Sequence, residues 1–202
     1  MMKIQPRTTN VRPDNATLVY SFNLFKNRRA FWALNGGGIA LLILFGMLFS
    51  WVVSLIRPSI AFELAISSAN ALFVCLSLLG IAAGQMVLHE LVHGVFIWLF
   101  TRSRPTFGFR GWYAYAAAPG WFFSRGQYLV VLLAPFVLLS VLGLILLTIV
   151  SQRIALMTIL LAAVLNAASS VSDLWITLLI IRERRPIVIE DLGDGMNFYT
   201  LN

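Results

Sequence analysis

The chain has 202 residues, of which 59% are hydrophobic and only 11% are charged, and its formal net charge is +7. Charged residues make up about 25% of an ordinary soluble domain, so the composition argues against that class and predicts an integral membrane protein. We assign the positive charge to basic residues beside membrane helices, and we predict no binding of nucleic acid.

Four long apolar stretches predict four transmembrane helices, at residues 30–56, 64–100, 127–150 and 154–181. The second stretch is too long for one straight crossing of a core of about 30 Å. We therefore expect its beginning, at residues 67–70, to project from the bilayer or the helix to bend near Gly84. The four helices would form one domain over residues 30–181, between an N-terminal segment, 1–29, and a tail, 182–202.

The basic residues predict the orientation of these helices. The N-terminal segment carries six Lys and Arg residues, the loop at 101–126 carries four and the tail carries three, whereas the other two connections carry one each. Because Lys and Arg accumulate in cytoplasmic loops, this alternation places both termini and the 101–126 loop in the cytoplasm.

Two segments outside the helices have strand and turn signals. Aromatic residues and glycines in the loop at 104–124 predict a small β-hairpin, with Phe107 and Phe109 on one face and turns at Gly111 and at residues 119–120. An interfacial belt of aromatic side chains explains the same residues equally well. The tail also has a strand–turn–strand pattern. The predicted fold is an all-α integral membrane protein with this small β-hairpin.

The only two histidines of the chain lie in the second predicted helix, in the stretch His89-Glu-Leu-Val-His93. Residues four apart share one face of a helix, so both imidazoles can bind one metal ion. Glu90 lies beside that face and can take a proton from a metal-bound water as general base. Zinc suits these ligands. The alternative is that neutral histidines pack against neighbouring helices, with Glu90 bonded to one of them.

A catalytic zinc site takes a third protein ligand, and Asp173 is the candidate. Glu90 and Asp173 are the two carboxylates inside the predicted spans. Counted at about 1.5 Å per residue from the cytoplasmic helix ends, Asp173 lies about 12 Å deep, and His93 and His89 about 10 and 16 Å. The alternative is that Asp173 caps a broken helix or bonds to nearby serines. Asn166 can donate to a substrate carbonyl or oxyanion, or can bind another helix.

These motifs, followed by the stretch "YLVVLLAPF" and a later aspartate, resemble the site-2 protease clan of intramembrane metalloproteases. The chain is most similar to small bacterial membrane proteins described as "putative zincin peptidases". The resemblance covers roughly residues 80–200 and implies that His89, His93 and Asp173 bind zinc and that Glu90 is the base. It also implies that β-structure near the site, at residues 106–123, presents an extended substrate.

The sequence predicts a zinc-dependent intramembrane endopeptidase of the bacterial cytoplasmic membrane. Its partners would be a membrane protein substrate and the lipid bilayer. One alternative is a non-catalytic metal-binding membrane scaffold or chaperone. A divalent-metal transporter is a weaker alternative, because the chain has no histidine beyond His89 and His93 for a second ligand cluster.

Overall fold

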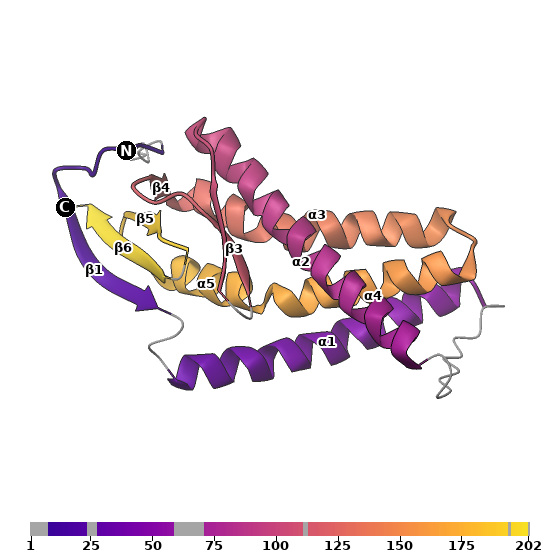
Figure 1. Ribbon diagram of the computed structural model, residues 1–202. Helices are drawn as coiled ribbons and strands as arrows, with labels where there is room; N and C mark the ends of the chain where they lie inside the picture. The colour runs from indigo at the N-terminus through magenta and orange to yellow at the C-terminus, as the bar shows by residue number, and fades with distance from the viewer. Residues whose placement is uncertain (1–7, 24–27, 59–70, 111–112, 194, 202) are drawn as a thin grey trace.

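The computed structural model describes residues 8–23, 28–58, 71–110, 113–193 and 195–201. Within them the chain forms five helices and six strands, in the order β1–α1–α2–β2–β3–β4–α3–α4–α5–β5–β6. The strands gather at one end of the helices, and α2 crosses α3 and α4 at a steep angle (Figure 1).

The helices follow the predicted apolar stretches. They are α1 (Arg28–Ile56), α2 (Ala71–Thr101), α3 (Arg125–Ile149), α4 (Arg153–Ser169) and α5 (Val171–Arg182). Three of them are long and apolar enough to cross a membrane, and α4 with α5 makes a fourth candidate if this bent pair is one span. This is consistent with the predicted membrane protein. The expected projection at residues 67–70 lies outside the described residues, and α2 continues as helix through Gly84.

The predicted fourth helix is broken at Ser170, where α4 and α5 meet at 41°. The buried Ser170 hydroxyl donates to the backbone oxygen of Asn166 at 2.8 Å, and the Ser169 hydroxyl donates to the same oxygen at 3.0 Å. Serine hydroxyls that bond back to a carbonyl of the preceding turn compete with the helical ladder and bend helices. The new helix, α5, begins at Val171, two residues before Asp173.

Four strands form an antiparallel sheet in the order β1-β6-β5-β4, and β2 and β3 form a separate hairpin. The strands are β1 (Ala16–Asn23), β2 (Thr106–Phe109), β3 (Ala114–Ala117), β4 (Phe122–Ser124), β5 (Ile187–Asp191) and β6 (Gly195–Leu201). The β2–β3 pairing confirms the predicted hairpin, and β5 with β6 confirms the strand–turn–strand pattern of the tail. The predicted turn at Gly111 lies outside the described residues.

The four-stranded sheet corrects the all-α part of the predicted fold. Strand β1 comes from the N-terminal segment and pairs with β6 of the tail, while β4 of the 101–126 loop pairs with β5. The pairing joins residues as far apart in sequence as Ala16 and Leu201, and no local pattern specifies such a partner. The protein is therefore mostly helical with a small sheet.

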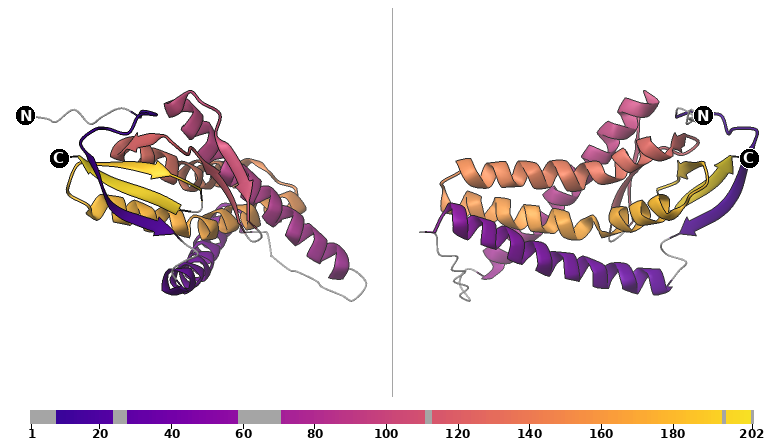
Figure 2. Two further views of the ribbon diagram at one scale, coloured as in Figure 1. Left: turned by 60° about the vertical axis from the view of Figure 1, so that its left-hand side comes forward. Right: turned by 180° about the vertical axis from the view of Figure 1, so that it is seen from behind.

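The largest buried cluster joins this sheet to the helices. It includes Ile97 of α2, Tyr128 of α3, Ile180 of α5, Ile189 of β5 and Phe198 of β6, all less than 9% exposed. Both views of Figure 2 show the sheet beside the start of α3 and the end of α5. Burial of these side chains, at about 25 cal/mol per Å² of apolar surface, holds the cluster together and fixes the sheet against the helices.

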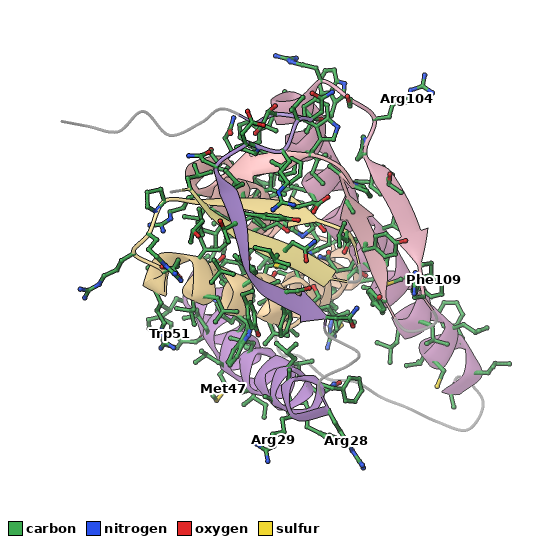
Figure 3. The ribbon with its side chains drawn as sticks, turned by 90° about the vertical axis from the view of Figure 1, so that its left-hand side faces the viewer. Arg28, Arg29, Met47, Trp51, Arg104 and Phe109 are labelled. Atoms are coloured by element: carbon green, nitrogen blue, oxygen red, sulfur yellow. The ribbon has the colours of Figure 1, made fainter. Side chains whose placement is uncertain are left out.

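The long helices keep large apolar side chains on their outer faces. Trp32, Met47 and Trp51 of α1 and Phe73 of α2 are each at least 60% exposed. Met47 and Trp51 lie on the outside of α1, and Arg28 and Arg29 lie at its start (Figure 3). Such exposure of large apolar side chains is rare on a soluble monomer and is consistent with the predicted membrane helices.

Candidate metal centre

Two histidines of α2 and one aspartate of α5 meet inside the protein. His89 and His93 lie one turn apart on the buried face of α2. The Nε2 atom of His89 is 3.1 Å from Oδ2 of Asp173, and Nε2 of His93 is 3.5 Å from the same oxygen. Asp173 is in the first turn of α5, where the positive end of the helix dipole favours a carboxylate. The structure thus brings the three predicted ligands together, while their role stays a prediction.

The backbone carbonyl of Val131 orients His93, because a proline deprives this carbonyl of its usual helical donor. The Nδ1 atom of His93 is 2.8 Å from the backbone oxygen of Val131 on α3. In a regular helix this oxygen accepts from the amide four residues later, but that residue is Pro135, which has no N–H. Because a carbonyl only accepts, Nδ1 donates this hydrogen bond, and Nε2 is the ring nitrogen that faces Asp173.

Asn166 orients His89 in the same way. Its Oδ1 atom is 3.1 Å from Nδ1 of His89 and accepts a hydrogen bond from Gln85 at 2.9 Å. Its Nδ2 atom donates to the backbone oxygen of Pro135 at 3.3 Å, which identifies the oxygen end of the amide. Asn166 is 0% exposed. Of the two roles predicted for Asn166, the structure favours binding to other helices, and it leaves no surface of this residue open to a substrate.

Sequence analysis missed Gln85, although a signal was present. Gln85 lies four residues before His89 and therefore on the same face of α2. A buried amide in an apolar helix needs a hydrogen-bond partner, and Asn166 is that partner.

The side chains at this site fit a zinc ion. Two imidazole nitrogens and one carboxylate oxygen converge, and imidazole and carboxylate are ligands that zinc takes. The Glu90 carboxylate is near as well, since ligand atoms of His89, Glu90 and His93 lie within 4.8 Å of one another. In the described part of the chain, this is the only group of three or more His, Cys, Asp or Glu side chains so placed.

A cavity of about 100 Å³ opens beside these residues. Glu90, His93 and Asp173 reach its wall, and β3 of the hairpin forms another part of that wall. The backbone amide of Ala116 in β3 hydrogen-bonds to the Glu90 carboxylate. The carboxylate that is predicted as general base therefore lies at the cavity, next to the histidines.

The cavity wall also includes Asp191 and Tyr128, which sequence analysis did not identify. Asp191 ends β5, and its carboxylate accepts from the Tyr128 hydroxyl at 3.0 Å and from the Gly193 amide at 2.9 Å. Burial raises the pKa of Asp191 to about 6, although the amide and the hydroxyl lower it. In the sequence Asp191 belongs to a polar turn of the tail, and nothing local indicates that β5 returns to the site.

Replacing Pro135 with alanine should weaken zinc binding without touching any ligand. The alanine would supply an amide that competes with His93 for the Val131 carbonyl. Loss of such an orienting partner typically costs about 10–100-fold in metal affinity. Zinc titration of the purified variant checks this expectation. Val137→Ala, at an exposed site of the same helix, is the control and should bind zinc like the wild type. Unchanged zinc affinity in Pro135→Ala would show that the proline does not influence how His93 binds the metal.

Comparison with known proteins gives one result. No curated protein and no solved structure matches the chain. A family model described as "Putative zincin peptidase" matches residues 82–188, just over half of the chain. The matched region contains both histidines, Glu90 and Asp173. This description does not mention site-2 proteases, so that resemblance stays a prediction. The chain belongs to the family described as "Putative zincin peptidase", a name that implies a zinc metallopeptidase.

Proposed function

We propose that the protein is a zinc-dependent intramembrane endopeptidase that hydrolyses a peptide bond in a membrane-embedded or membrane-adjacent segment of another protein. The observation that supports it best is the convergence of His89, His93 and Asp173, beside a cavity whose wall includes His93, Asp173 and Glu90. Three potential ligands with a further carboxylate beside them are the side chains that a zinc hydrolase requires.

In this proposal Glu90 is the general base. A bound zinc ion would lower the pKa of a water molecule and polarise the substrate carbonyl. Glu90 accepts the proton of the water that attacks the carbonyl carbon, and then passes it to the leaving nitrogen, so that the C–N bond breaks into a carboxylate and an amine. Val131 and Asn166 hold the Nδ1 protons of His93 and His89, which keeps both Nε2 atoms available as ligands.

A second groove supports a substrate that arrives from the bilayer. It has a volume of about 420 Å³ and lies between α1 and the α4–α5 break, lined mainly by apolar side chains. Tyr113 and Ser172 line both this groove and the catalytic cavity, so the two spaces lie side by side. At Gly38 helix α1 comes close to α4, since a Cβ atom on this glycine would lie 3.4 Å from the backbone oxygen of Ala168.

The size of the cavity favours an unwound substrate. A helix with its side chains is about 10 Å across, which a space of about 100 Å³ cannot hold. A helical backbone also keeps its carbonyls in hydrogen bonds, so the segment must extend before a carbonyl can react. Strand β3 lines the cavity, and we propose that the extended substrate lies along it.

We also propose that the N-terminal segment, the 101–126 loop and the tail lie on the cytoplasmic side of a bacterial membrane. The supporting observation is that β1, β4, β5 and β6, which come from these three segments, form one sheet. Segments that pair in one sheet lie on the same side of the bilayer.

Cleavage of a reconstituted substrate panel tests the function. The panel consists of tagged single-span peptides of varied sequence in liposomes, together with short water-soluble peptides that carry the same cleavable sequences. Zinc-loaded protein should produce fragments that mass spectrometry identifies, and removing zinc with a chelator should stop cleavage until zinc is restored. Zinc binding without cleavage of any panel member would favour the scaffold alternative.

Blocking the groove should separate the two kinds of substrate. Ile39 lines the groove and is 62% exposed, so Ile39→Trp fills space without disturbing the core. We expect cleavage of single-span substrates to fall about ten-fold or more, because misplaced substrates react slowly, while short soluble peptides react as before. Met47→Trp, on the outer face of the same helix, is the matched control. Equal loss for both kinds of substrate, or for neither, would contradict substrate access through this groove.

The transporter alternative gains no support from the structure. A transport path needs successive polar sites, and the part of the chain that the structure describes contains one metal-ligating group. Zinc uptake into sealed proteoliposomes would nevertheless decide the matter directly, because an endopeptidase should accumulate none.

A further inference from the structure

We propose that Asp191 forms a subsite for a positively charged nitrogen of the substrate, next to the bond that is cut. This inference rests on the proposed peptidase function and adds a substrate class to it: extended segments that carry an ammonium or guanidinium group beside the scissile bond.

The first support is the way in which Asp191 is held. Its exposed fraction is 8%, and it lies at the end of β5 on the wall of the catalytic cavity. The Tyr128 hydroxyl donates to Oδ2 at 3.0 Å, and the Gly193 amide donates to Oδ1 at 2.9 Å. These bonds use one acceptor position on each oxygen, and a carboxylate has about four. Asp191 is therefore fixed in place and can still accept from a ligand.

The turn that carries Gly193 is fitted to the hairpin. Gly193 has φ +87°, and a Cβ atom there would come within 2.5 Å of the Tyr115 ring. Gly108 of β2 faces the same ring equally closely. Tyr115 thus packs between the tail turn and β2, and it lines the cavity as well. The position of Asp191 is therefore set relative to β3, along which we place the substrate.

The second support is the absence of a cation for Asp191 inside the described protein. Among the described residues, no Lys or Arg lines the cavity, and no ion pair involves Asp191. A buried carboxylate without a positive partner carries a desolvation cost. A partner that arrives with the substrate would remove this cost at the moment of binding.

The charges of the loaded site lead to the same conclusion. A divalent ion carries +2, the neutral histidines add nothing, and Asp173 and Glu90 together supply −2. Asp191 is then the surplus negative charge of the cavity wall. A cationic substrate group balances it, a neutral group does not, and an acidic group is repelled.

Either a lysine or arginine side chain or the free amino end of a chain could supply this nitrogen. Four peptides separate these sources. The peptides differ only beside the cleavable bond and at the N-terminus. Three have an acetylated N-terminus and carry lysine, norleucine or glutamate beside the bond. The fourth carries norleucine beside the bond and has a free amine at the end of the chain next to it. Binding is measured by fluorescence to zinc-loaded Glu90→Gln protein, which should bind without cutting, and cleavage is measured with Glu90 intact.

We expect wild-type protein, in both assays, to prefer a cationic peptide over the acetylated norleucine peptide about ten-fold or more, with the glutamate peptide weakest. Asp191→Asn should abolish this preference, and Asp191→Glu should retain most of it. Glu190→Gln removes the same charge one residue away. Glu190 bonds to Tyr199 and Asn197 and does not line the cavity, so this control should keep the preference.

The outcomes separate a failure of the proposed subsite from a failure of the proposed peptidase function. Cleavage without any charge preference in the wild type, a comparison that needs no variant at Asp191, would overturn the subsite and leave the peptidase. An unchanged preference in Asp191→Asn would overturn it too. Charge-selective binding that disappears in Asp191→Asn, with no cleavage of any peptide, would overturn the peptidase and leave the subsite.

Discussion

Replacing either His93 or Asp173 with alanine should remove zinc from the protein. Their Nε2 and Oδ2 atoms lie 3.5 Å apart, so each substitution deletes one member of the proposed three-ligand set. Loss of a partner that only orients a ligand costs about 10–100-fold in affinity, and loss of a ligand itself should cost more than about 100-fold. Metal analysis of detergent-purified protein should find one zinc per wild-type chain and almost none in either variant.

Asp191→Asn is the matched control for Asp173→Ala. Both positions are buried carboxylates at the same cavity, but Asp191 bonds to Tyr128 and Gly193 and not to a histidine. This control should keep its zinc. Zinc that persists in Asp173→Ala would instead move the third ligand to Glu90, whose carboxylate belongs to the group within 4.8 Å. Such a result would also deprive the proposed mechanism of its base.

The parts of the site that sequence reasoning could predict depend on short-range geometry. His89 and His93 are one helical turn apart, so their shared face follows from periodicity alone. Asp173 could be placed at a similar depth to the histidines, because in a membrane-spanning helix the residue number gives the depth, at about 1.5 Å per residue. The β2–β3 hairpin was predictable for a similar reason, since its aromatic residues and turn signals are adjacent in the chain.

The rest depends on contacts between distant segments. Strand β1 has three successive exposed apolar residues, Leu18, Val19 and Tyr20, and therefore lacks the alternation that identifies a strand with one buried face. Its partner, β6, comes from the far end of the chain. Asp191 reaches the cavity only because β5 pairs with both β6 and β4. A polar turn in a tail gives no indication of such a return.

The helix break before Asp173 and the effect of Pro135 could be predicted only in part. The serines before Asp173 were visible in the sequence, and a broken helix was one alternative there. The helix breaks here because Ser169 and Ser170 turn their hydroxyls back to the Asn166 carbonyl and not toward a neighbouring helix. The sequence does not show which way these hydroxyls turn. Similarly, Pro135 was visible, but its effect on His93 requires the knowledge that Val131 faces α2.

Replacing Glu90 with glutamine should leave zinc bound and almost abolish cleavage. Glutamine keeps the size of the side chain and can still accept the hydrogen bond from the Ala116 amide. It cannot take a proton from water near neutral pH, and removal of a general base typically lowers the rate about 10²–10⁴-fold. The measurement is the cleavage rate per bound zinc, with one peptide of the panel that the wild type cuts. Glu190→Gln, which changes a neighbouring carboxylate outside the cavity, should cleave normally.

The Glu90→Gln protein distinguishes three roles of this carboxylate, because zinc content and cleavage are read independently. Full zinc with lost cleavage is the expected result and assigns Glu90 to proton transfer. Loss of zinc together with cleavage would make Glu90 a ligand, and the distances among His89, Glu90 and His93 permit that arrangement. Full zinc with cleavage near the wild-type rate would contradict the mechanism, since no other carboxylate at the cavity hydrogen-bonds to β3 among the described residues.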